Sequence, residues 1–306
     1  MQRSFKDYLI ISFKGLAMGA ADAVPGVSGG TIAFISGIYE ELIASISNVN
    51  LSLFKTLFSK GLKTFWKQAN GNFLLALLTG IVISFISFMK LAKYLLEYHP
   101  VLIWSFFFGL IIASIFFIGK QITKWNITTI IALIIGSGVA FYISKLDPLG
   151  TNDSPWFLFL AGAIAICAMI LPGISGSFIL IILGAYKTLS TAVDDLDIKK
   201  IIIFGLGTII GLLSFSHILK WLFKNYHNIT LALLTGFIFG SLDKVWPWKK
   251  TLIWRIDSKG LEVPFKQESI SPFSFSGDNQ IMFSIVLMIL GFLTIFILER
   301  IGSKKE

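Results

Sequence analysis

Long runs of uncharged, apolar residues recur along the whole chain and constrain its fold more than any other feature. Of the 306 residues, 55% are hydrophobic and only 14% are charged, whereas a soluble domain carries about 25% charged residues. This composition excludes an ordinary water-soluble fold and a disordered chain. The runs also lack the alternation of polar and apolar residues over about 10 residues that is typical of an outer-membrane β-barrel. We therefore predict a polytopic helical membrane protein.

Several of these runs have the length of one membrane-crossing helix. The hydrocarbon core of a bilayer is about 30 Å thick, and an α-helix of about 20 apolar residues spans it. The predicted transmembrane helices cover about residues 73–98, 100–119, 125–144, 200–224, 225–242 and 279–298.

Two further apolar regions, at about 9–47 and 154–190, do not fit a single crossing. Residues 154–186 carry no formal charge, and as one helix they would be about 50 Å long, which exceeds the bilayer. Each region holds a break in its middle, Pro25–Thr31 in the first and Pro172–Ser177 in the second. Proline and glycine interrupt a continuous helix. We predict that each region forms a re-entrant helical hairpin, with a broken crossing as the alternative.

The two halves of the chain repeat each other. Pro25–Leu42 aligns without gaps on Pro172–Leu189, and the following helices match at a second offset. Identical pairs include Pro25/Pro172, Gly26/Gly173, Ser28/Ser175, Gly29/Gly176, Gly37/Gly184, Tyr39/Tyr186, Gly80/Gly207 and Gly109/Gly236. We predict an all-α fold of two repeats, residues 1–147 and 148–306, each a hairpin followed by three transmembrane helices. Because each repeat crosses the membrane three times, the second repeat has the opposite orientation in the membrane. Inverted repeats with broken helices in corresponding positions are typical of alternating-access transporters, with the binding site where the breaks meet.

The distribution of lysines predicts the orientation of the chain. Positive residues gather in cytoplasmic loops, and the loop at 48–72 carries Lys55, Lys60, Lys63 and Lys67. This loop lies inside if the first region is a hairpin, and both termini are then cytoplasmic. The basic loop at 243–278 falls outside, and loops of that length obey the rule only weakly.

Both breaks have the composition of an anion-binding turn. The start of a helix carries a partial positive charge and unpaired N–H groups, and glycine lets an anion approach the backbone. Serine and threonine hydroxyls add donors. We predict that the turns bind a phosphate or carboxylate, with a kink or close helix packing as the alternative. The candidate residues are Pro25, Gly26, Ser28, Gly29, Gly30, Thr31, Pro172, Gly173, Ser175, Gly176 and Ser177.

Three ionisable residues are further candidates. Asp22 precedes the first break in an otherwise apolar stretch, and an ionisable group at membrane depth is a functional candidate by default. It would repel a phosphate unless protonated, which makes proton-coupled binding one role; capping of a half-helix is the alternative. Lys93 and Lys220 are repeat-related and end their helices. They attract a phosphate headgroup or, alternatively, snorkel to the interface.

Other kinds of site find no support in the sequence. The one cysteine, Cys167, lies in an apolar run, and the three histidines lack metal-ligand spacing. Arginine occurs only at Arg3, Arg255 and Arg300, so the basic balance is typical of loops near anionic lipid rather than of a nucleic-acid surface. We expect no metal, no cofactor and no nucleic-acid partner. The oligomeric state stays open, a homo-oligomer included.

The first break lies in a recognisable signature. Gly15–Thr31 (GLAMGAADAVPGVSGGT) closely resembles the opening signature of the PopT family, and Leu171–Ser177 (LPGISGS) resembles its second one. The resemblance extends from about Lys14 to Leu298. Members of this family, formerly a domain of unknown function, are bacterial polyprenyl-phosphate transporters that return undecaprenyl phosphate across the plasma membrane for envelope synthesis. The resemblance implies a plasma-membrane transporter, not an enzyme, with polyprenyl phosphate as its substrate.

Two other functions stay open. Membrane undecaprenyl-pyrophosphate phosphatases are also inverted-repeat proteins with re-entrant helices, and they have a Pro-Gly-x-Ser-Arg-type loop. In this chain Gly29 and Gly176 follow the two serines, and neither loop contains an arginine or a Ser-His pair. The charge stabilisation that phosphoryl transfer needs is therefore missing. A small-anion channel or exchanger would use the same breaks.

Overall fold

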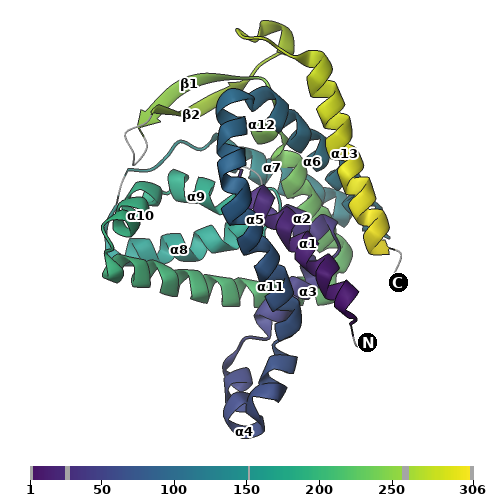
Figure 1. The fold of residues 1–306 in the computed structure, drawn as a ribbon, viewed down its shortest axis with the longest axis vertical. Coiled ribbons are helices and arrows are strands. Elements are labelled where there is room, and N and C mark those ends of the chain that lie inside the picture. Colours follow the sequence, from purple (N-terminus) through teal and green to yellow (C-terminus); the bar gives the residue numbers. More distant parts are fainter. Residues whose placement is uncertain (1–2, 25–27, 151, 257–261, 304–306) are drawn as a thin grey trace.

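Helices form most of the described chain, and one β-hairpin lies across one end of it (Figure 1). The computed structural model describes residues 3–24, 28–150, 152–256 and 262–303. In this part of the chain, four helices are long and apolar enough to cross a membrane, or five if a bent pair is counted as one span. The four are α5 (Gly71–Tyr98), α6 (Pro100–Gln121), α7 (Ile127–Lys145) and α11 (Ile198–Gly240) extended by α12 (Leu242–Val245).

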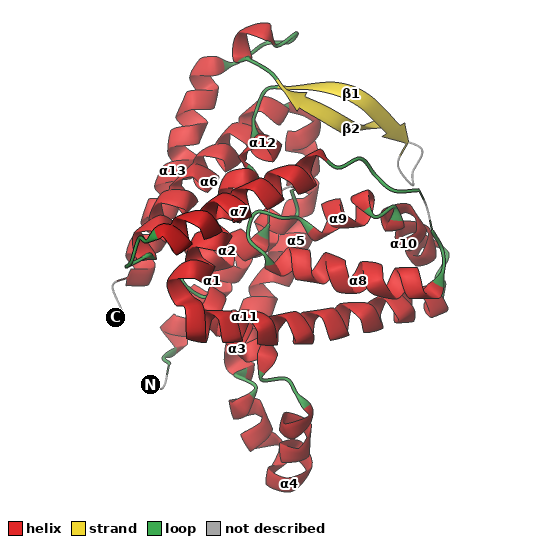
Figure 2. Ribbon diagram, turned by 180° about the vertical axis from the view of Figure 1, so that it is seen from behind, coloured by secondary structure: helices red, strands yellow, loops and turns green. Residues whose placement is uncertain are grey.

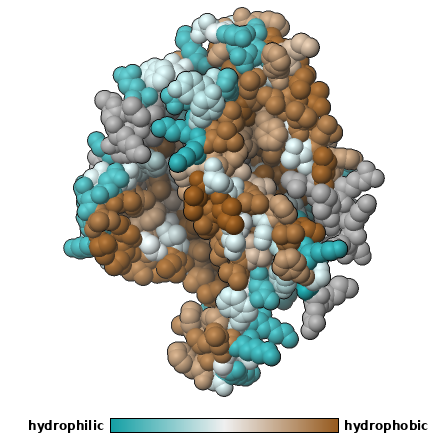
Figure 3. Space-filling view, viewed as in Figure 1, coloured by the Kyte–Doolittle hydropathy of each residue, from teal (hydrophilic) through white to brown (hydrophobic). Residues whose placement is uncertain are grey.

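These helices follow the predicted ranges, with one difference. The predicted helices at 200–224 and 225–242 form one element, α11, that is kinked at Tyr226 (φ −136°, ψ 46°). The polar residues 225–228 contain no glycine or proline. The backbone bends at Tyr226, and the chain is helical on both sides of this bend. The last predicted helix is α13 (Ile281–Ser303). Large apolar side chains stay exposed along α5, α7 and α13. Brown apolar surface covers much of the face shown in Figure 3, as expected of helices that face lipid.

Each predicted hairpin region contains one more break than the sequence indicated. The first consists of α1 (Phe5–Asp22), α2 (Gly29–Ile35) and α3 (Tyr39–Ser47), and the second of α8 (Pro155–Ile170), α9 (Gly176–Ile182) and α10 (Ala185–Asp194). The additional breaks fall at Gly37 (φ 72°) and Gly184 (φ 74°), which the repeat alignment pairs. Only glycine adopts this left-handed backbone at little cost. At Gly184 the chain bends by 110° between α9 and α10.

The predicted lysine-rich loop at 48–72 is largely helical. It forms α4 (Leu51–Gln68), which is interrupted at Gly61 (φ 78°) and projects from the body of the protein (Figures 1 and 2). Its lysines alternate with apolar side chains at helical spacing, and Phe58 is 88% exposed. The projection therefore shows both teal and brown surface in Figure 3. The sequence prediction missed this helix because its lysine content obscured the apolar spacing.

The 243–278 segment contradicts a purely α-helical fold. After α12 it forms the antiparallel strands β1 (Lys249–Ile256) and β2 (Glu262–Ser269), followed by a 3-10 turn, η1 (Pro272–Ser274). Two indoles fasten the segment: Trp246 donates to the Ile270 carbonyl at 2.8 Å and Trp248 donates to the Asn279 carbonyl at 2.8 Å. The described parts of the segment, residues 243–256 and 262–278, cover one end of the helices with regular structure (Figure 2).

Glycines set the closest helix contacts. Helix α5 packs against α1, the first part of α11 against α8, α6 against α13, and the last part of α11 against α7. At each contact a glycine of one helix faces a backbone carbonyl of the other: Gly80 faces Ser12, Gly207 faces Phe159, Gly109 faces Met288 and Gly236 faces Leu133. The glycines that the sequence pairs between the two halves thus occupy corresponding helix contacts.

We expect Gly80→Leu to separate α1 from α5 and to destabilise the protein. A side chain at Gly80 would be forced into the Ser12 carbonyl, and overpacking of this kind costs about 1–3 kcal/mol. The measurement is thermal unfolding in detergent, where the variant should melt several degrees lower. The matched control is Gly138→Leu on α7, where an added Cβ has no neighbour within 4 Å. Equal melting of the two variants would contradict the assignment.

Candidate functional site

The two glycine-rich turns lie in direct contact, as the repeat predicted. The Gly173 N–H of the second turn donates to Thr31 Oγ1 of the first at 2.9 Å. Ser28 Oγ donates to the Met169 carbonyl at 3.4 Å, and a Cβ on Gly30 would lie 2.6 Å from the Ile170 carbonyl oxygen. Glycine is therefore required at position 30 for the first turn to approach the end of α8.

The N–H groups at the start of α2 already have partners. Asp22 Oδ1 accepts from the Gly29 N–H at 2.7 Å, Ser28 Oγ accepts from the Gly30 N–H at 3.1 Å, and the Ser28 carbonyl accepts from the Thr31 N–H at 3.0 Å. Pro25 and Gly26, two of the predicted site residues, lie outside the described residues.

Asp22 therefore occupies the position at which the sequence placed a substrate anion. Its carboxylate ends α1 and caps the start of α2, and a Cβ on Gly29 would collide with its oxygens. A carboxylate at a helix start is stabilised by the N–H groups there. A phosphate can engage these donors only if Asp22 moves away. The capping alternative for Asp22 is thus the one present in this conformation.

The second turn is shaped by backbone approach and by a pair of hydroxyls. Gly173 adopts a left-handed conformation (φ 84°), beside a buried Pro172. A Cβ on Gly176 would lie 2.8 Å from the Ala165 carbonyl oxygen, so this glycine is needed for packing of α9 on α8. Ser175 Oγ and Ser177 Oγ lie 2.9 Å apart. One of these two hydroxyls donates to the other, which leaves the second O–H for another acceptor.

Tyr39 joins the two broken regions, and the sequence prediction gave it no role. Its hydroxyl donates to the Ile170 carbonyl at 3.2 Å, and its ring packs edge-on against Phe34 and Phe223. The residue is 2% exposed. The signal was present as the repeat identity Tyr39/Tyr186, but that identity does not reveal that the hydroxyl satisfies a carbonyl freed by the other break.

The two lysines proposed from the sequence lie on helix surfaces. Lys93 is exposed on α5, and Lys220 Nζ of α11 donates to Asn48 Oδ1 at 3.0 Å, just beyond α3. Among the described residues, the hydrogen bonds and ion pairs connect neither lysine to the two turns.

An apolar cavity of about 340 Å³ lies among α5, α6 and α13. Its walls are Phe88, Leu95, His99, Leu102, Ile103, Phe106, Phe107 and Leu287. This volume is within the range of ligand-binding cavities. Apart from the imidazole of His99, the lining side chains are aliphatic or aromatic, which suits a hydrocarbon chain.

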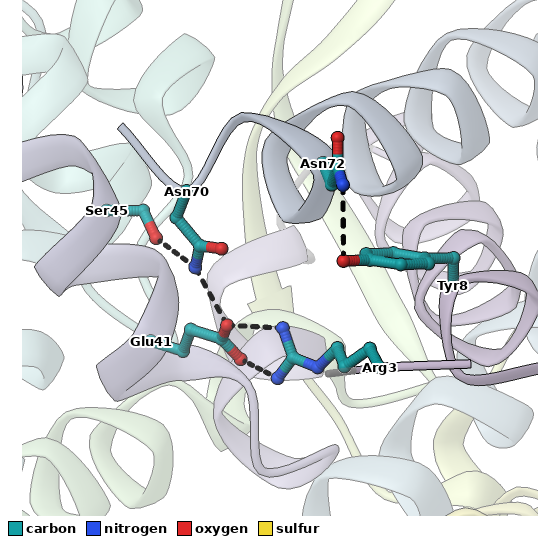
Figure 4. Close-up of polar contacts among 6 residues, drawn as sticks. All are labelled: Arg3, Tyr8, Glu41, Ser45, Asn70 and Asn72. Atoms are coloured by element: carbon teal, nitrogen blue, oxygen red, sulfur yellow. Dashed lines mark hydrogen bonds and ion pairs between the residues drawn. The ribbon is translucent and has the colours of Figure 1, made fainter. Parts of the chain in front are cut away.

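A polar cluster fastens the N-terminal segment to α3 and α5 (Figure 4). The Arg3 guanidinium donates to both carboxylate oxygens of Glu41 at 2.6 Å. The Asn70 side chain donates to Glu41 at 2.8 Å and to Ser45 at 3.0 Å. Bidentate arginine–carboxylate pairs are the stronger kind of ion pair. The cluster therefore holds α3 against the N-terminal segment and the start of α5.

No group of three or more metal-ligating side chains occurs among the described residues. The described part of the chain thus offers lipid-facing helices, two interlocked turns and an apolar cavity, but no metal centre.

The known proteins to which this chain is similar belong to the class of polyprenyl-phosphate transporters. The sequence profile of the VCA0040-like family, described as undecaprenyl phosphate translocase-like, matches residues 18–263, and the chain belongs to this family. It is 47% identical over 302 residues to the polyprenyl-phosphate transporter of Vibrio cholerae serotype O1, covering 97% of this chain and 98% of the relative. It is 31% identical over 313 residues to the polyprenyl-phosphate transporter of Staphylococcus aureus, covering 96% of each. No solved structure matches the chain.

These comparisons confirm the resemblance seen in the two signatures. They also agree with the expectation of a transporter rather than an enzyme, because both relatives are named as transporters.

We expect Glu41→Gln to weaken the N-terminal cluster in a pH-dependent way. At pH 7 the free energy of unfolding should fall by about 1 kcal/mol, since the pair is about one-third exposed and partly screened. Burial alone would raise the pKa of Glu41, but the bonds from Arg3 and Asn70 outweigh burial and hold that pKa below its usual value.

A carboxyl group with a lowered pKa stabilises the folded state above its unfolded pKa of about 4.3, and this contribution is lost as the pH falls through the folded pKa. Thermal unfolding at pH 7 and pH 3 checks the sign. The difference between wild type and Glu41→Gln should be larger at pH 7 than at pH 3. The exposed Glu97→Gln serves as control. An equal difference at the two pH values would assign the effect to packing.

Proposed function

We propose that this protein transports undecaprenyl phosphate or a related polyprenyl phosphate across the bacterial plasma membrane for carrier-lipid recycling. The observation that carries the proposal is the direct contact of two broken-helix turns, in a chain that is 47% identical to a polyprenyl-phosphate transporter over nearly its full length. Moving a bare phosphate through hydrocarbon is very costly. A protein that satisfies the phosphate while the prenyl tail stays in lipid lowers this cost.

The transporter consists, in this proposal, of two inverted-topology repeats, residues 1–147 and 148–306. The support is that glycines paired by the sequence alignment make corresponding helix contacts, Gly80 with α1 and Gly207 with α8, Gly109 with α13 and Gly236 with α7. The lysine distribution supports a cytoplasmic location of both termini and of α4. Movement of one repeat against the other would then expose the turns alternately to the two sides.

The headgroup binds at the two turns, with Asp22 as its competitor. Asp22 satisfies the Gly29 N–H when no substrate is bound. An arriving phosphate and Asp22 are both anions that seek the same donors, so binding requires that Asp22 be displaced or protonated. This step couples substrate binding to the charge and position of the Asp22 carboxylate.

The prenyl tail leaves the protein sideways through the apolar cavity among α5, α6 and α13. This cavity is lined by Leu95, Ile103 and Phe107 and by other apolar side chains. A tail held there buries apolar surface without a polar cost.

Two further candidates use the same turns. A pyrophosphate phosphatase is disfavoured because neither turn carries the cationic side chain that phosphoryl transfer needs. A small-anion channel would pass inorganic anions without lipid.

One reconstitution experiment separates these functions. Purified protein is placed in liposomes that carry labelled undecaprenyl phosphate in one leaflet. Leaflet exchange of the intact lipid supports the proposal. Release of free phosphate would indicate a phosphatase, and flux of inorganic phosphate without lipid exchange would indicate a channel.

We expect Asp22→Asn to change the pH dependence of transport. Asparagine is neutral at every pH and cannot compete as an anion, so the variant's transport rate should vary less with pH than that of wild type between pH 5 and 8. The rate of leaflet exchange at a series of pH values measures this effect. Gly29→Ala is the companion variant, because its Cβ would push the Asp22 carboxylate away without removing its charge. An unchanged pH profile in Asp22→Asn would remove Asp22 from the mechanism.

We expect Leu95→Trp to fill the apolar cavity and to slow transport of long-chain polyprenyl phosphates more than that of short-chain ones. The cause is steric, because the indole would occupy volume that the tail needs. Leaflet exchange of labelled lipids of two chain lengths gives the ratio. Leu78→Trp, at an exposed position of α5, is the control. If both variants slow both lipids equally, the tail does not use this cavity.

A further inference from the structure

Helix α4 separates its apolar side chains from its polar ones. Gly61 divides the helix into two short parts, residues 51–60 and 62–68. In each part the apolar residues recur three or four positions apart, which places them on one face of a helix. The rings of Phe54 and Phe65 lie 6.0 Å apart, so the apolar faces of the two parts meet. The exposed members of this apolar face, between 41% and 88% accessible, are Leu51, Phe54, Phe58, Leu62 and Trp66.

The polar face of α4 carries only positive charge. Its four lysines are Lys55, Lys60, Lys63 and Lys67, and all four are exposed. Residues 48–72 contain no aspartate, glutamate or arginine. Among the described residues, none of these lysines belongs to an ion pair. The surface beside the apolar face is therefore complementary in charge to an anionic surface.

Hydrogen bonds fasten α4 to the start of α5. The Asn48 side chain donates to the Gln68 carbonyl at 3.3 Å, which brings the two ends of α4 together. The Trp66 indole donates to Oδ1 of Asn72, the second residue of α5, at 2.6 Å. The exposed apolar side chains of α5 begin at Leu75, less than one helical turn further on. Helix α4 is therefore held where α5 enters the lipid.

Neither part of α4 is long enough to cross a membrane, since a crossing takes about 20 apolar residues. The helix projects beyond the end of α5 instead (Figure 1). A helix with aromatic and leucine side chains on one face and lysines on the other is typical of helices that lie in the plane of the headgroups. Each lysine near an anionic surface strengthens binding by about fivefold. The charge of α4 thus favours an anionic lipid surface over a neutral one.

We propose that α4 docks on the anionic membrane surface, with its apolar face at the boundary of the acyl chains and its lysines on the phosphate groups of anionic phospholipids. This role goes beyond the transport function and does not depend on which lipid is transported. It accounts for the large apolar side chains that stay exposed outside the spanning helices, because acyl chains would cover them.

Two adjacent positions test where the apolar face lies. Phe58→Cys places a nitroxide label on the apolar face, and Ser59→Cys places one on the polar face. Cys167→Ala in both variants restricts labelling to the new site. The full chain is studied in nanodiscs that contain phosphatidylglycerol. We expect the label at position 58 to meet oxygen, relative to a water-soluble nickel chelate, several-fold more often than the label at position 59, because oxygen concentrates among acyl chains.

The two relaxation agents together identify what covers the apolar face. Contact of the label at position 58 with oxygen but not with nickel supports the proposal. If the nickel chelate reaches positions 58 and 59 equally, the face lies in water and the proposal is overturned. If both agents are excluded from position 58, the face is covered by protein, such as a second copy of this chain, which overturns the proposal as well.

The second measurement tests the charge of α4. Photoactivatable phosphatidylglycerol or phosphatidylcholine is added to the nanodisc, and crosslinks to residues 51–68 are quantified by mass spectrometry. We expect phosphatidylglycerol to crosslink several-fold more, and this preference to fall with salt, which screens the attraction. The double replacement Lys60→Gln and Lys63→Gln should reduce the preference several-fold.

The matched control is the double replacement Lys187→Gln and Lys199→Gln, which removes two exposed lysines outside α4 and should leave the preference unchanged. Thermal melting of each variant checks that it is folded. Equal crosslinking of the two lipids to wild-type α4 would overturn the proposal. A preference that the α4 double variant retains in full would overturn it as well.

Discussion

Every helix break in a membrane frees backbone N–H and C=O groups that hydrocarbon cannot satisfy, and each such group costs several kcal/mol. In this protein the two broken regions satisfy each other. Thr31 accepts the N–H of Gly173, and Tyr39 donates to the carbonyl of Ile170. Asp22 accepts the N–H of Gly29 from within the first region. Neither broken region satisfies all of its own backbone N–H and C=O groups, so the two halves of the chain depend on each other for stability.

This arrangement bears directly on the proposed transport. Asp22 accepts the N–H of Gly29, a donor that an anionic headgroup would use if it binds at the turns as proposed. In the proposed mechanism, exchange of one anion for another would change the number of satisfied donors little and would keep the free energies of the bound and empty states similar. A carrier needs such a balance, because a headgroup that binds too tightly on one side of the membrane is not released on the other.

Contacts near both ends of the helical body fasten segments that lie far apart in the sequence. The Arg3–Glu41 pair fastens the N-terminal segment to α3, which carries Tyr39 at its start. At the other end the β-hairpin brings Lys249 to the segment that carries Lys244. Between these ends, glycines allow backbone contact between helices at four crossings.

The sequence by itself determined the membrane class, the approximate bounds of the spanning helices, the family and the two main breaks. These features depend on local composition, because bilayer thickness sets helix length and proline and glycine interrupt helices wherever they lie. Internal repetition further indicated that the breaks meet. The additional breaks at Gly37 and Gly184 were not predicted, since a single glycine is often tolerated within a helix.

Only the tertiary structure decided which hydrogen-bond donor pairs with which acceptor. Thr31 and Gly173 are 142 residues apart, and no local pattern reveals that one accepts the other's N–H. The same holds for the β-hairpin and for Lys244 beside Phe178. A hydrogen bond or a charge near a ring depends on the position of both partners in space, and that position follows from the packing of the whole chain.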